Sequence, residues 1–132
     1  MARDKLARIL VVDDDDSVRN SLAGFLEDYD YKVKSSSSAE DALALIRHEP
    51  FDVAIIDLRL PEMDGEELIK TIYDERYQIR FLIHTGSYAF RLTPILMAIG
   101  MRADHVFHKP QVNLEPMRNT IEMIIKENIV WK

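Results

Sequence analysis

Short, predominantly apolar runs alternate along the chain with segments in which apolar residues recur every three or four positions. Residues 8–12, 52–57 and 79–85 are such runs, and they are typical of strands buried on both faces of a sheet. Residues 31–35 alternate polar and apolar side chains, as an edge strand does, and residues 104–109 are predicted as another strand. The pattern therefore predicts five strands.

A helix start signal follows each predicted strand. In chain order these signals are Asp15 or Asp16, Ser37 with Glu40 as its capping-box partner, Asp64 with Glu67, Thr93 before Pro94, and Asn113. The first helix is expected to turn one apolar face inward, formed by Val18, Leu22, Phe25, Leu26 and Tyr29.

Strands that alternate with helices imply right-handed crossovers and a parallel sheet covered on both faces. The predicted fold class is α/β: a single five-stranded parallel sheet in a doubly wound, flavodoxin-like (βα)5 arrangement. We expect one domain over residues 1–132, with its core from about residue 6 to residue 130 and no output domain in this chain. No linker or repeat is visible, and 132 residues suit a single core.

Composition narrows the range of functions. The chain has 17 basic and 23 acidic side chains, a net charge of -6 and no cysteine. This balance argues against direct nucleic acid binding and favours a cationic ligand or a basic partner. Thiolate metal sites and cysteine nucleophiles are excluded, and no apolar run approaches the ~20 residues of a membrane span. The N-terminus has no apolar signal-peptide region, so the expected location is the cytoplasm.

The candidate chemistry lies where the predicted strands end. In an open parallel sheet, ligands bind outside the carboxyl ends of the strands. That edge receives Asp13 and Asp14 from the first strand, Asp57 from the third, Thr85 from the fourth and Lys109 from the fifth. Crowded carboxylates suit Mg²⁺, and a hydroxyl beside an ammonium suits a phosphoryl group. Asp57 stands alone on a central strand and is the candidate nucleophile for an acyl phosphate.

Four motifs in this order, "ILVVDDD", "DVAIIDLRLPEMDG", "HTG" and "HKP", resemble the receiver domain of bacterial two-component response regulators, which has the fold of the chemotaxis regulators. The resemblance covers essentially the whole chain. It implies that Asp57 accepts a phosphoryl group from a sensor histidine kinase or phosphotransfer protein, and that the chain is a signalling switch rather than an enzyme. At most, it would phosphorylate and dephosphorylate itself.

The resemblance also assigns the other site residues. Asp13 and Asp14 match the acidic pair that holds Mg²⁺ together with Asp57, and the main-chain carbonyl of Arg59 matches a further ligand. Thr85 matches the hydroxyl that moves to bind the phosphoryl group. Lys109 matches the lysine that pairs with that group, and the bond to the following proline is expected to be cis.

The sequence departs from the family pattern on the output side. Val106 occupies the position usually held by an aromatic switch residue, and the segment from Thr85 to Lys109 is slightly longer than usual. Arg59 and Ser87 stand where the family places residues that tune hydrolysis of the acyl phosphate. Arg59 is compatible with shielding that group or with orienting the attacking water.

Two other functions remain open from the sequence. An aspartate-nucleophile phosphatase shares the Mg²⁺ site, but it typically needs a second aspartate where Arg59 stands. A degenerate receiver would act only as a docking module, and its expected sign is the loss of a site residue. The output partner or domain is not encoded in any motif, and a homodimer through the face of the fourth and fifth helices is a further expectation.

Overall fold

The computed structural model describes the backbone from residue 7 to residue 131 and the side chains up to residue 127. The strands are β1 (Arg8–Val12), β2 (Lys32–Ser36), β3 (Val53–Ile56), β4 (Arg80–Thr85) and β5 (Val106–His108). The helices are α1 (Asp16–Glu27), α2 (Ala39–His48), α3 (Gly65–Asp74), α4 (Pro94–Ile99), the 3-10 turn η1 (Ala103–His105) and α5 (Glu115–Trp131). None of these helices, within residues 7–131, is both long and apolar enough to cross a membrane.

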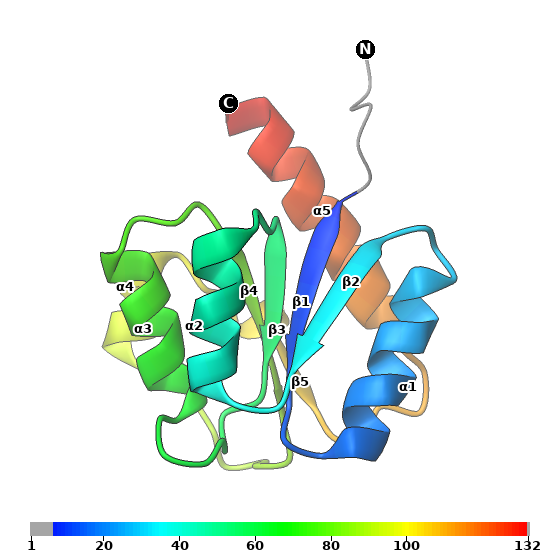
Figure 1. Cartoon of the computed structure of the whole chain (residues 1–132), viewed down its shortest axis with the longest axis horizontal. Helices are drawn as coiled ribbons and strands as arrows, with labels where there is room; N and C mark the ends of the chain where they lie inside the picture. The colour runs from blue at the N-terminus through cyan, green and yellow to red at the C-terminus, as the bar shows by residue number, and fades with distance from the viewer. Residues whose placement is uncertain (1–6, 132) are drawn as a thin grey trace.

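All five strands pair in parallel, in the order β2-β1-β3-β4-β5. Helices α2, α3 and α4 are grouped on one side of the sheet, and α1 and α5 lie on the other (Figure 1). The doubly wound α/β prediction is therefore confirmed. The expected core limits near residues 6 and 130 fall outside the side chains that the structure describes.

The central strands are largely apolar because they have a helical layer on each side. Leu10 and Ala54 point into the core beneath α2, α3 and α4, whereas Ile9 and Val53 point into the core beneath α1 and α5. At one edge of the sheet, β2 buries only Ser36 fully, which fits its alternating sequence. The burial pattern thus places β1 and β3 at the centre, where they deliver their terminal aspartates.

Three local predictions need correction. The cap of α2 is Ser38, which accepts a hydrogen bond from the Asp41 amide (3.2 Å), because β2 runs on to residue 36 and delays the helix by one residue beyond Ser37. Tyr29 lies past the end of α1 and is 41% exposed, so it is not part of the buried face. Residues 104–109 form a strand only in part.

The predicted fifth strand begins late because a turn replaces its first residues. The backbone amide of Arg102 donates a hydrogen bond to Nδ1 of His105 (3.2 Å), and the His105 amide donates to the Arg102 carbonyl (2.9 Å). These two bonds close η1, and β5 starts at residue 106. The caps predicted at Asp15, Asp64 and Thr93 are confirmed, each accepting from the amide three residues on. Asn113 instead accepts from the Glu115 amide, two residues on, at the start of α5.

Candidate functional site

A residue of the site follows the carboxyl end of each of the strands β1, β3 and β5. The backbone amide of each of these residues donates a hydrogen bond to a neighbouring strand. The Asp13 amide donates to the Ser36 carbonyl (3.1 Å), and the Asp57 amide donates to the Val12 carbonyl (2.9 Å). The Lys109 amide donates to the carbonyl of Thr85 (2.7 Å), the last residue of β4. These bonds extend the sheet ladder by one residue, so the side chains are placed by the sheet rather than by flexible loops.

The sheet brings three carboxylates together. Oxygen atoms of Asp13, Asp14 and Asp57 all lie within 4.8 Å of one another. Asp13 and Asp57 are 2% and 6% exposed, whereas Asp14 faces solvent. Two like charges ~4 Å apart repel by about 4 kcal/mol at an effective dielectric of ~20. The cluster therefore needs positive charge, and it presents only oxygen atoms, the ligands that Mg²⁺ prefers.

Lys109 supplies part of that charge. Its ammonium nitrogen lies 2.8 Å from Oδ2 of Asp13 and 3.1 Å from Oδ2 of Asp57. The side chain extends from the end of β5, and the peptide bond that follows it, Lys109–Pro110, is cis as expected. One lysine thus bridges the aspartates of two neighbouring strands, which leaves the cluster of three carboxylates net negative.

The electrostatic environment shifts both partners. Burial raises the pKa of Asp57, and the negative charge of Asp13 adds to this effect, while Lys109 and the Arg59 amide act in the opposite direction. Burial by itself would lower the pKa of Lys109, but its hydrogen bonds and charge interactions with Asp13 and Asp57 together raise it. The lysine is therefore held charged, and the Asp57 carboxylate is less stable as an anion than an exposed one.

Backbone and side-chain donors orient the two buried carboxylates. The Asp15 amide donates to Oδ1 of Asp13 (2.9 Å), and the Arg59 amide donates to Oδ1 of Asp57 (3.3 Å). The Arg19 guanidinium donates to the main-chain carbonyl of Asp13 (2.8 Å). The sequence analysis missed Arg19, because a single basic residue in a helix carries no signal of a contact with the preceding loop.

Gly65 is a second residue that the sequence analysis did not select. A Cβ atom at this position would lie 2.3 Å from the carbonyl oxygen of Asp57 and 2.8 Å from Cα of Leu58. The amide of Gly65 donates to the Leu58 carbonyl (2.9 Å), so the start of α3 is held against the backbone of the Asp57 loop. Glycine is required here because no other residue permits this approach.

Thr85 is fully buried at the end of β4, and its Oγ1 accepts a hydrogen bond from the Ser87 amide (3.1 Å). Asp13, Asp57 and Lys109 thus form one contacting group, and a carboxylate oxygen of Asp14 lies within 4.8 Å of those of the two aspartates. Thr85 lies at the same sheet edge with its hydroxyl engaged in the loop that leads to α4. A hydroxyl held in this way uses one acceptor position and keeps its own O–H to donate to a ligand.

The family of the protein follows from its sequence relatives. The family model of the response regulator receiver domain matches residues 9–122. The chain belongs to the response regulator receiver family. It is 31% identical over 120 residues to the response regulator receiver protein CpdR of Brucella abortus (strain 2308), covering 91% of this chain and 98% of that protein.

Two further comparisons show the range of this family. The receiver chain is 34% identical over 107 residues to the response regulator GtcR of Aneurinibacillus migulanus, covering 81% of this chain but 43% of that protein. A CheY-like receiver domain from Methanospirillum hungatei superposes with a TM-score of 0.72 at 29% identity, covering 93% of this chain and 99% of the other. The chain thus spans the full length of some relatives and less than half of others.

Proposed function

We propose that this receiver is a phosphoacceptor switch that takes a phosphoryl group on Asp57 from a sensor histidine kinase or phosphotransfer protein. The observation that carries the proposal is the Asp57 carboxylate itself. It is almost fully buried at the end of a central strand, contacts the Lys109 ammonium at 3.1 Å, and shares a cluster with two more carboxylates. The family membership supports the same role.

In the proposed step, a carboxylate oxygen of Asp57 attacks the phosphorus atom of a phosphohistidine. A new O–P bond forms, the N–P bond breaks, and its electron pair returns to the imidazole nitrogen of the donor. The product is an acyl phosphate on Asp57. Lys109, already beside Oδ2, offers a positive charge to the phosphoryl oxygens, and the Arg59 amide holds Oδ1 of the attacking carboxylate.

The residues present fit a bound Mg²⁺ ion, because the cluster offers oxygen donors alone and its repulsion calls for a cation. Asp13, Asp14 and Asp57 would hold the ion, with the main-chain carbonyl of Arg59 as the proposed further ligand. When bound, Mg²⁺ supplies positive charge that offsets the repulsion between the carboxylates and the incoming phosphoryl group. Lys109, which follows β5, contributes the second positive charge.

The proposed response begins at Thr85. Its hydroxyl, which accepts from the Ser87 amide, would turn to donate its own O–H to a phosphoryl oxygen and release that amide, and the loop that follows would move with it. That movement would control a partner protein or an output domain. The cytoplasm as location and a homodimer through the α4 and α5 face remain predictions of the same kind.

The structure bears on the two alternatives. A phosphatase of the aspartate-nucleophile type would need a general acid two residues after Asp57, and Arg59 offers only its amide and an exposed side chain there. A docking module would not need the charged cluster, in which Asp13 and Asp57 are buried and paired with Lys109 at some cost. The phosphoacceptor therefore accounts for the most features of the site.

The test is the intact mass of the protein after incubation with acetyl phosphate, with and without Mg²⁺. We expect one added phosphoryl group that requires Mg²⁺, is lost in Asp57→Asn, and is kept in Asp74→Asn, a surface carboxylate paired with Lys70. Consumption of acetyl phosphate without any added mass would indicate a phosphatase. No reaction with acetyl phosphate or with a phosphorylated histidine phosphotransfer domain would leave only the docking module.

A further inference from the structure

A second cavity lies at the opposite edge of the sheet, beside the amino end of β4. It has a volume of about 340 Å³, within the range of small-molecule sites, and its walls come from α3, the loop before β4, β4 itself and the segment from α4 to η1. Arg80 lines it, whereas Thr85 at the other end of β4 belongs to the phosphoacceptor site. Five steps of ~3.3 Å separate these two residues by roughly 16 Å, so the two sites are distinct.

One wall of the cavity carries an unpartnered donor. His105 is 2% exposed, and within the described chain its Nε2 has no hydrogen-bond partner. The carboxylate of Asp104 is 3.8 Å away, too far for a hydrogen bond. Because Nδ1 accepts from the Arg102 amide, the proton of the neutral ring is assigned to Nε2. Burial lowers the pKa of His105, which keeps the ring neutral at pH 7.

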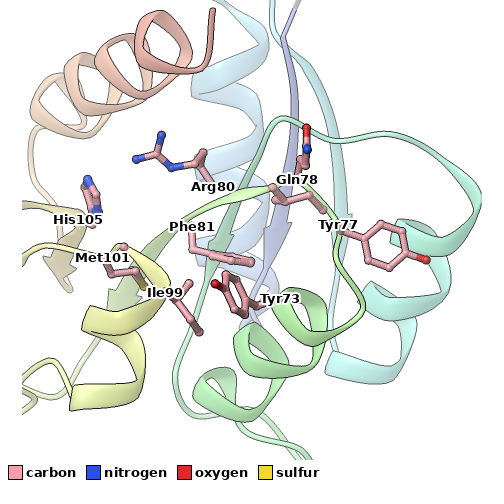
Figure 2. A pocket seen from close by; sticks show the side chains of 10 residues that line it. Tyr73, Tyr77, Gln78, Arg80, Phe81, Ile99, Met101 and His105 are labelled. Carbon is pink, nitrogen blue, oxygen red and sulfur yellow. The ribbon is translucent and has the colours of Figure 1, made fainter. Parts of the chain in front are cut away.

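A second polar group comes from Arg80. Its guanidinium contacts Glu127 through Nη2 (3.2 Å), and within residues 7–127 this contact leaves Nε and Nη1 for another acceptor. The guanidinium end is turned towards the side of the cavity where His105 lies (Figure 2). The cavity therefore has a cation and, on the same side, a neutral and buried imidazole ring.

The other side of the cavity is apolar and aromatic. Phe81 is nearly buried and Tyr73 is half exposed, and both lie across the cavity from His105 (Figure 2). Ile99 and Met101 complete the apolar lining. Such walls suit a flat ring, since aromatic side chains stack on ring faces.

We propose that this cavity binds a small aromatic carboxylate. The ring would lie between the aromatic and aliphatic side chains, and the carboxylate would accept hydrogen bonds from the Arg80 guanidinium, beside the buried and uncharged ring of His105. The arrangement combines apolar walls with a few convergent polar groups, as small-molecule sites do. The proposal is independent of phosphorylation at Asp57.

The test is a titration of the full chain with benzoate, in which the backbone amide chemical shifts are measured at each step. A second titration uses benzamide, the neutral analogue. We expect saturable shifts confined to residues 73–81 and 99–105, in the millimolar range expected for a ligand of about nine non-hydrogen atoms. Benzamide should bind at least about tenfold more weakly, because it lacks the charge that pairs with Arg80. Equal binding of the two probes, or no saturable shift, would overturn the proposal.

Two variants separate recognition from stability. Arg80→Gln and Glu127→Gln both break the same ion pair, so a merely structural effect would move benzoate binding in the same direction in both. We expect Arg80→Gln to weaken binding about tenfold and Glu127→Gln to strengthen it, because the glutamine frees the guanidinium and removes a repelling charge. Parallel changes in the two variants would show that the carboxylate is not bound by Arg80.

Discussion

The two sides of the proposed phosphoacceptor site differ in how closely their side chains are packed and paired. On the β1 and β3 side, Asp13 and Asp57 are buried, bridged by Lys109 and oriented by backbone amides. On the β4 and β5 side, a groove of about 820 Å³ opens between the loop before α4 and β5. The first, closed side fixes the groups that we propose to perform chemistry, whereas the second, open side leaves room for the backbone to move.

The open side coincides with the departures from the family pattern. Val106 lines the groove together with Phe90 and Leu92, and its short side chain cannot fill it as an aromatic ring would. Tyr88 is 68% exposed, yet its hydroxyl donates to the Lys109 carbonyl (3.0 Å) and its ring meets that of His108 edge-on. The receiver thus combines the expected group of site residues with a neighbouring region that has its own packing.

The largest expected effect on stability comes from removing the Lys109 ammonium group on the β1 and β3 side of the site. Lys109→Met leaves two buried carboxylates without their common partner, so the free energy of unfolding should fall by about 3 kcal/mol in urea titrations without divalent cations. The exposed pair of Lys70 and Asp74 gives the control: Lys70→Met should cost less than about 0.5 kcal/mol. Similar losses of unfolding free energy in the two variants would show that the buried ion pair matters no more than the exposed one.

A backbone contact on the same side gives the next effect. Gly65→Ala should lower the free energy of unfolding by about 1–3 kcal/mol, because the new Cβ meets the Asp57 carbonyl oxygen. It should also slow phosphorylation by acetyl phosphate. Gly24→Ala meets no atom within 4 Å inside α1 and should stabilise the protein by about 0.5–1 kcal/mol. A neutral Gly65→Ala would show that α3 adjusts freely.

Because the pKa of Asp57 is raised in the folded protein, its carboxylate should lower the free energy of unfolding in a pH-dependent way. The folded protein binds this proton more tightly than the unfolded chain, so stability falls as pH rises from 3.8 through the raised pKa. Thermal unfolding should therefore show Asp57→Asn gaining stability over the wild type across that interval and keeping the gain at pH 7. Saturating Mg²⁺ should reduce the gain; a variant less stable than the wild type at pH 7 without Mg²⁺ would refute the sign.

The smallest expected effect lies on the open side. Phosphorylation should change hydrogen exchange in residues 86–104, because the Thr85 hydroxyl leaves the Ser87 amide. Thr85→Val should lose about 1 kcal/mol of stability, still gain the phosphoryl mass, and lose the exchange response, whereas Thr85→Ser should keep it. Unchanged exchange in the phosphorylated wild type would place the output elsewhere.

Most of the fold was predictable because its signals are local. Apolar runs marked the strands, and side-chain caps at Asp15, Asp64 and Thr93 marked helix starts. The errors arose where neighbouring signals competed. Ser37 and Ser38 are equally good caps by sequence, and the length of β2 decided between them.

The sequence by itself determined which residues meet at the carboxyl edge, because parallel strands of known order end together there. Only the tertiary structure decided how they meet. The bridge from Lys109, the contact of Arg19 with the Asp13 carbonyl and the close approach of Gly65 join residues far apart in the chain or depend on backbone paths. The cavity around His105 is of the same kind, since its walls come from separate elements that become neighbours only when the helices pack on the sheet.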